Sequence, residues 1–146
     1  MGILYSLDTP KNILYIVWKG EIKAETWFNQ VRKLTAEPDW PAISRVIVDL
    51  QNASTNVINQ DIETIATLFG EHPGQVVKKR VAVLANELFG KAKTFGGLLE
   101  RFGVSLVVFT SFYTACTFLG LIPTETEEAL KQLRLTLDHQ TDSAAT

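Results

Sequence analysis

The arrangement of this chain is decided by residues 80–119, which read RVAVLANELFGKAKTFGGLLERFGVSLVVFTSFYTACTFL. The apolar runs 81–85 and 104–109 predict two strands, and a helical stripe lies between them. Its apolar residues recur at i, i+4, i+7, i+11 and i+14: Leu88, Ala92, Phe95, Leu99 and Phe102. A short apolar helix follows and ends at Leu119. Strands that alternate with helices predict a layered α/β domain with parallel strands joined by crossovers.

Two glycines and two caps refine this prediction. Gly96 and Gly97 lie inside the predicted helix, where each glycine costs about 1 kcal/mol relative to alanine. We therefore expect a neighbouring backbone to approach the helix closely there. Asn86 is placed to cap this helix, and Thr110 or Ser111 to cap the next one.

The N-terminal half predicts a hairpin followed by further strand and helix units. Residues 3–7 and 13–18 are β-rich and flank a Pro- and Asn-containing turn, so they should pair antiparallel. Residues 43–50 predict a strand whose core, residues 46–48, is continuously apolar, typical of a strand covered on both faces, and a polar loop should follow. The remaining helices are indicated by apolar stripes that include Trp27, Phe28, Val31, Ile62, Ile65, Ala66, Leu130, Leu133 and Leu137. The predicted fold is α/β, with a mixed sheet of about five strands and about five helices.

The composition is typical of a single globular domain. The chain has 146 residues, of which 46% are hydrophobic and 21% charged, enough to bury one core. We assign residues 1–139 to this domain and expect residues 140–146, which are small and polar, to form a flexible tail. The net charge of −2 gives no reason to expect a nucleic acid as partner. No signal sequence and no apolar run of about 18 residues occurs, so we expect no membrane span and a cytoplasmic protein.

Patterns typical of catalysis or metal binding do not occur in the sequence. Cys116 is the single cysteine, which fits a reducing compartment, and its apolar helical neighbours favour a buried position. His72 and His139 stand far apart and predict no metal site. No glycine-rich phosphate loop is present. We therefore expect no enzymatic activity and no cofactor.

Three further features concern the surface. The basic residues 78–80 are expected to form a solvated strand edge. Trp40, between an aspartate and a proline, and Tyr113 are expected to be exposed anchors for a partner. These aromatic side chains lie outside the helical stripes.

Polar side chains that follow the predicted parallel strands form the candidate site. In open α/β sheets, ligands bind beyond the carboxyl ends of the strands. The candidate residues for a partner or ligand surface are Asp49, Asn52, Ser54, Thr55, Asn59, Asp61 and Asn86. The same residue types also form caps and turns, with Asn59 placed to cap a helix and Asp61 near its positive end.

The chain resembles STAS-type domains, the fold of bacterial anti-sigma-factor antagonists, and most closely their SpoIIAA-like branch. The resemblance spans nearly the whole chain. It is carried by residues 46–50 (VIVDL), 80–84 (RVAVL) and 107–109 (VVF), together with Ala115. It implies a small bacterial regulatory or protein-interaction module without enzymatic activity.

The regulatory serine of that family has no counterpart here. The antagonists begin the helix after the Asp-Leu strand with a D-S-S-G-like motif, whose serine is phosphorylated. This chain reads VINQD at residues 57–61, and Ser54 and Thr55 lie several residues earlier. We therefore assign no phosphorylation site.

Two functional hypotheses remain open. The chain could bind another protein, or a second copy of itself, through residues 52–61. It could instead bind a small apolar ligand or lipid, which the large number of aromatic residues favours. A cavity beside the Asp49 loop would support the ligand hypothesis, and an exposed apolar patch there would support the protein partner.

Overall fold

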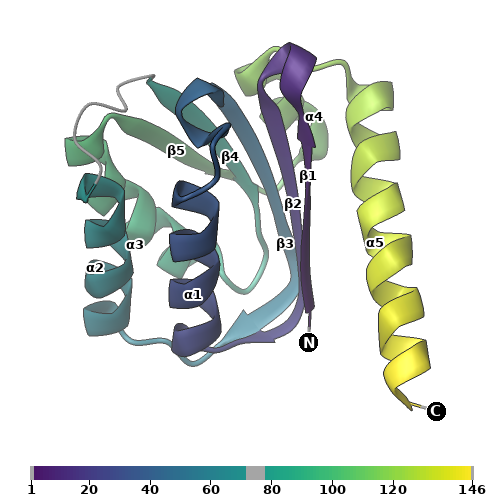
Figure 1. The fold of residues 1–146 in the computed structure, drawn as a ribbon, viewed down its shortest axis with the longest axis horizontal. Coiled ribbons are helices and arrows are strands. Elements are labelled where there is room, and N and C mark those ends of the chain that lie inside the picture. The colour runs from purple at the N-terminus through teal and green to yellow at the C-terminus, as the bar shows by residue number, and fades with distance from the viewer. Residues whose placement is uncertain (1, 72–77, 146) are drawn as a thin grey trace.

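The structure, a computed structural model, describes residues 2–71 and 78–145, which contain one five-stranded sheet. The strands are β1 (Gly2–Asp8), β2 (Ile13–Ile22), β3 (Arg45–Thr55), β4 (Lys79–Leu84) and β5 (Val104–Phe109). They lie in chain order across the sheet (Figure 1). β1 pairs antiparallel with β2, and all other neighbours pair in parallel. The predicted mixed sheet with an N-terminal hairpin is confirmed.

Five α-helices within the described residues cover the two faces of this sheet. They are α1 (Ala24–Thr35), α2 (Asn59–Thr67), α3 (Phe89–Leu99), α4 (Phe112–Leu119) and α5 (Pro123–Ala145). α1, α2 and α3 lie on one face, and α4 and α5 on the other (Figure 1). Because side chains of a strand alternate between faces, each strand contributes to two cores. We name the two sides the α1–α3 face and the α4–α5 face.

β3 is longer than the sequence predicts, because β2 continues beyond Trp18 and offers it a partner. Residues 52–55, expected to form a loop, pair in parallel with residues 19–22. Between this segment and the first part of the ladder, residues 50 and 51 oppose Trp18 alone, which is a β-bulge. The loop prediction for residues 52–55 is therefore wrong.

α3 approaches β5 closely at one of its two glycines. A β-carbon added at Gly96 would lie 3.1 Å from the carbonyl oxygen of Leu106, whereas one at Gly97 would meet nothing within 4 Å. The expected close approach is confirmed for Gly96 and wrong for Gly97. Only the first glycine is explained by packing.

Two predicted caps are displaced by the way their helices begin. α2 starts at Asn59 itself, and its cap residue is Ile58. The Asp61 carboxylate accepts a hydrogen bond from the Ile58 N–H at 3.1 Å, so the acid supplies the cap. α3 starts at Phe89, because a turn in which the Phe89 N–H donates to the Asn86 carbonyl at 3.3 Å precedes it. Neither Asn59 nor Asn86 is the cap residue of its helix.

The cap of α4 and the C-terminal end of α5 bear on two predictions from the sequence. Ser111 caps α4, accepting a hydrogen bond from the Thr114 N–H at 3.4 Å, which confirms one of the two predicted positions. α5 is helical through Ala145, where the sequence analysis expects a flexible tail from residue 140. The flexibility of that segment stays a prediction.

Trp40 and Lys79 are buried rather than exposed, which corrects two expectations. Trp40 is 6% exposed and Lys79 is 4% exposed. The Lys79 ammonium lies 4.3 Å from the centre of the Trp40 ring and donates to the carbonyls of Trp40 and Ile43 at 2.7 and 2.6 Å. The short 3₁₀ helix Trp40–Ala42 folds over the lysine and covers it. This burial lowers the pKa of Lys79 to about 8.

Candidate functional site

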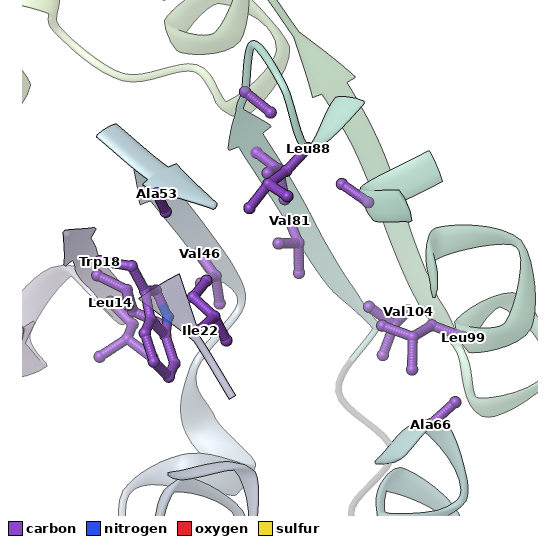
Figure 2. Close-up of a cluster of buried hydrophobic side chains, with 14 of the residues drawn as sticks. Leu14, Trp18, Ile22, Val46, Ala53, Ala66, Val81, Leu88, Leu99 and Val104 are labelled. Atoms are coloured by element: carbon purple, nitrogen blue, oxygen red, sulfur yellow. The ribbon is translucent and has the colours of Figure 1, made fainter. Parts of the chain in front are cut away.

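An apolar cavity of about 150 Å³ lies between the sheet and the helices of the α1–α3 face. The sheet side of the cavity is formed mainly by branched aliphatic residues, including Ile16, Val46, Val48, Val81 and Val83. The helix side is formed largely by aromatic rings: Trp27, Trp40, Phe69 and Phe95. Figure 2 shows part of the surrounding core, with Trp18 and Val46 on one side and Leu88 and Leu99 on the other.

The aromatic rings on the helix side pack against one another. Trp27 of α1 meets Phe95 of α3 edge to face, with ring centres 4.8 Å apart. Phe95 in turn meets Phe69 at 6.0 Å, and Phe69 meets Trp40 at 6.1 Å. Such pairs are favourable beyond the area they bury. The rings therefore form a connected layer that joins α1, α3 and the segments after α1 and α2.

Space remains where β3 and β4 carry valines beneath this layer. A valine extends only to its γ carbons, so the valines of β3 and β4 do not reach far toward the rings. Val48 illustrates the result, since it is half-buried although it lies on the central strand of the sheet. Its neighbour Ile47, on the α4–α5 face, is fully buried. The cavity therefore lies on the face to which Val48 points.

Lys91 combines a place in the cavity lining with hydrogen bonds to the backbone. It lies in the first turn of α3, and its ammonium donates to the carbonyl of Val57 at 2.7 Å and to that of Thr55 at 3.4 Å. Among the described residues that line the cavity it is the only charged one. Gln30 and Thr55 add uncharged polar groups, and Tyr5 a phenol.

Tyr5 joins the edge strand β1 to the segment after α1. Its hydroxyl donates to Oε1 of Glu37 at 2.7 Å, and the Lys33 ammonium lies 5.9 Å from the ring centre. The hydrogen bond to Glu37 raises the pKa of Tyr5, with burial adding to the effect. This contact holds the end of α1 over the edge of the sheet beside the cavity.

Asp49 lies on the opposite side of the sheet from the cavity. It is 2% exposed, and its Oδ2 accepts from Nε of Arg134 on α5 at 2.9 Å. Its Oδ1 accepts from the Gln51 N–H at 3.0 Å. Arg134 also donates from Nη1 to Glu127 at 2.9 Å. The carboxylate thus joins β3 to α5.

The sheet separates the other predicted site residues as well. Asn52 and Ser54 are exposed and pair in register with Lys19 and Glu21 of β2. Thr55 borders the cavity, and its hydroxyl accepts from the Val57 N–H at 3.2 Å. Asn59, Asp61 and Asn86 lie where the next helices begin. Of the seven predicted residues, Thr55 is the one that lines the cavity.

Lys91 was missed in the sequence analysis, although its spacing carried a signal. It follows Leu88 by three residues and precedes Phe95 by four, so it lies on the apolar stripe of its helix. A lysine on such a stripe needs a polar partner or a route to solvent. Here the partners are carbonyl groups at the end of β3 and in the segment that follows.

Cysteine and histidine are the other residue types considered for reactive chemistry or metal binding. Cys116 is fully buried, and this burial raises the pKa of its thiol. Within residues 2–71 and 78–145 no cluster of three or more His, Cys, Asp or Glu side chains could hold a metal ion. His72 lies outside the described residues. None of the helices that the structure describes is long and apolar enough to cross a membrane.

The fold resembles a solved structure. It is the crystal structure of an uncharacterized protein from the DUF3478 family with a SpoIIAA-like fold, from Shewanella loihica PV-4. The similarity has a TM-score of 0.51 and covers 81% of this chain and 94% of the other, at 15% sequence identity. No protein-family model and no curated protein matches the chain. The comparison confirms that the chain has a SpoIIAA-like α/β fold.

Proposed function

We propose that this protein binds a small apolar ligand in the cavity of the α1–α3 face. The observation that carries the proposal is the cavity of about 150 Å³ with its aliphatic and aromatic lining. Apolar cavities of about this volume stay dry and can take up a molecule such as benzene. The proposed activity is binding rather than catalysis.

The energetics of packing support this function. Protein cores are packed about as densely as organic crystals, with few voids larger than a water molecule. Side chains around an unfilled space lose free energy because they lack the contacts that dense packing would give them. A ligand that fills the space recovers part of that free energy. The cavity therefore favours occupation by an apolar molecule.

Intrinsic fluorescence offers a direct test, because all three tryptophans, Trp18, Trp27 and Trp40, line the cavity. Titration with 1-octanol, a neutral apolar probe, should change the tryptophan emission to a saturating value. At ten times its dissociation constant, a ligand stabilises the folded state by about 1.4 kcal/mol, or about 5 °C in melting temperature. No emission change and no rise in melting temperature would contradict the proposal.

A variant that fills the cavity provides the control. Val48→Phe places a ring in the space and should abolish octanol binding while raising the melting temperature. Val107→Phe makes the same change on β5 at a side chain that is 38% exposed and does not line the cavity. It should bind octanol like the unmodified protein. Ala92→Leu, from the helix side of the cavity, keeps the test decisive if Val48→Phe does not fold.

Binding of another protein is the second candidate function. It is supported by Ile58, which is 60% exposed beside Asn59 and Asp61 at the start of α2. Together with the family resemblance, this favours a bacterial, cytoplasmic regulatory module with a contact surface at residues 52–61. Light scattering after size exclusion would test self-association. An Ile58→Asp variant should then shift a dimer to monomer, and a monomeric unmodified protein would contradict self-association.

A further inference from the structure

The ligand of this cavity should match its charge as well as its shape. Within residues 2–71 and 78–145, the lining contains one ammonium, from Lys91, and no carboxylate. No carboxylate of these residues lies within ion-pair distance of Lys91 either. A charged ligand group beside Lys91 is therefore favoured when it is negative.

The hydrogen bonds of Lys91 fix where that group would lie. The carbonyls of Val57 and Thr55 hold the ammonium at the end of β3, on the rim where parallel strands end. An ammonium has three N–H donors, and these carbonyls accept two of them. One donor therefore remains for a ligand. The aliphatic part of the lysine can lie along the apolar wall while its charge stays at the rim.

The surroundings of the ammonium also limit the charge and size of the ligand. A single ammonium neutralises one negative charge, so a dianionic phosphate would keep a second charge that loses its hydration without a partner, whereas a carboxylate would not. A cavity of about 150 Å³ accepts a body of about six to eight carbon atoms, comparable to benzene or slightly larger. A lipid with two acyl chains exceeds that volume.

We propose that the cavity takes a small apolar monocarboxylate, which rests on the proposed function. The carboxylate accepts a hydrogen bond from Lys91, and the hydrocarbon body lies against Trp27 and Phe95. Lys91 thereby selects an acid over a neutral or cationic molecule with the same chain. Charge-assisted hydrogen bonds are about twice as strong as neutral ones, so the acid should bind more tightly than a neutral molecule with the same chain.

Three probes of equal chain length test this inference: octanoate, 1-octanol and octylamine. On the unmodified protein, tryptophan fluorescence and calorimetry should give octanoate about tenfold tighter than octanol, and octylamine weakest. Lys91→Gln should weaken the binding of octanoate about tenfold and change the dissociation constant of octanol by less than about twofold. Lys91→Arg should retain the preference for the acid. The matched control is Lys93→Gln, an exposed lysine on the same helix, which should bind all three probes unchanged.

The outcomes separate this inference from the proposed function. If none of the three probes binds, the cavity function itself fails. If octanol binds and octanoate binds no better, or if Lys91→Gln leaves the octanoate affinity unchanged, the selection by Lys91 is overturned while the cavity function stands. The ranking on the unmodified protein and the Lys91→Arg variant keep the test decisive if Lys91→Gln does not fold.

Discussion

The two faces of the sheet are built from alternate residues of the same strands, yet they pack differently. On β3, Ile47 is fully buried on the α4–α5 face, whereas Val48 is half-buried beside the cavity of the α1–α3 face. The helices explain the difference. α5 directs the aliphatic Leu130, Leu133 and Leu137 into the core it forms with the sheet, whereas α1 and α3 carry rings that pack on each other.

The two faces of the sheet contribute differently to the packing of the protein. The α4–α5 face supplies close packing and an ion pair between the buried Asp49 and the half-buried Arg134. The α1–α3 face gives up part of that packing and contains the cavity. Because stability usually comes from dense packing, one well-packed face permits a cavity on the other.

A matched pair of leucine truncations should give the largest difference between the faces. Leu130 on α5 is fully buried, and Leu34 on α1 is half-buried and borders the cavity. Leu130→Ala should lower the free energy of unfolding by about 3 to 4 kcal/mol, because it opens a new void. Leu34→Ala should cost about 1 to 2 kcal/mol, because its side chain has fewer neighbours to lose. Urea unfolding measures both, and equal losses would remove the distinction between the faces.

Removing the arginine from the Asp49–Arg134 ion pair should have the next largest effect. Arg134→Met keeps the aliphatic stem but leaves the Asp49 carboxylate, 2% exposed, with the Gln51 N–H as its remaining partner. We expect a loss of about 2 to 3 kcal/mol, and a partial recovery in the double variant with Asp49→Asn. Glu127→Gln, which removes the exposed partner of Arg134, should change stability by less than about 0.5 kcal/mol. If Arg134→Met lowered the free energy of unfolding no more than Glu127→Gln does, the Asp49–Arg134 pair would contribute little to stability.

The fold was accessible from the sequence because it is encoded in local periodicity. The apolar runs and the stripe within residues 80–119 each predict one element, and short connections leave few ways to arrange them. Alternation along β3 also indicates which face each side chain occupies. Asp49 stands between Val48 and Leu50, so a carboxylate on that strand had to face away from both.

The cavity was not accessible in this way, because it depends on distances between layers. No local pattern states that Trp27 and Phe95 pack on each other instead of on the sheet. The buried position of Lys79 has the same origin, since the segment that covers it is far away in the sequence. Lys91 is the exception, because a lysine on an apolar stripe is visible in the sequence alone.

The buried Lys79, on the α1–α3 face, should make the free energy of unfolding depend on pH. Burial lowers its pKa to about 8 in the folded protein, against about 10.4 for an unfolded chain. Between these values the unfolded state binds more protons than the folded state, so the free energy of unfolding should rise with pH. We expect a gain of about 1 to 2 kcal/mol between pH 8 and 10, relative to the same measurement on Lys79→Met. Parallel pH profiles of the two proteins would show that Lys79 titrates normally.

Two alanine substitutions on α3 should show where the helices of the α1–α3 face touch the sheet. At Gly96 a β-carbon would press on the backbone oxygen of Leu106, which cannot move without disturbing β5. Gly96→Ala should therefore cost about 1 kcal/mol, even after the gain in helix propensity. Gly97→Ala meets no neighbour within 4 Å and should stabilise the protein by about 0.5 to 1 kcal/mol. Thermal unfolding of both variants would settle the sign of each effect. A loss of stability for Gly96→Ala with a gain for Gly97→Ala would show that α3, which carries Phe95 of the aromatic layer, contacts β5 at Gly96. Stabilisation by both substitutions would mean that α3 stands off the sheet along its whole length.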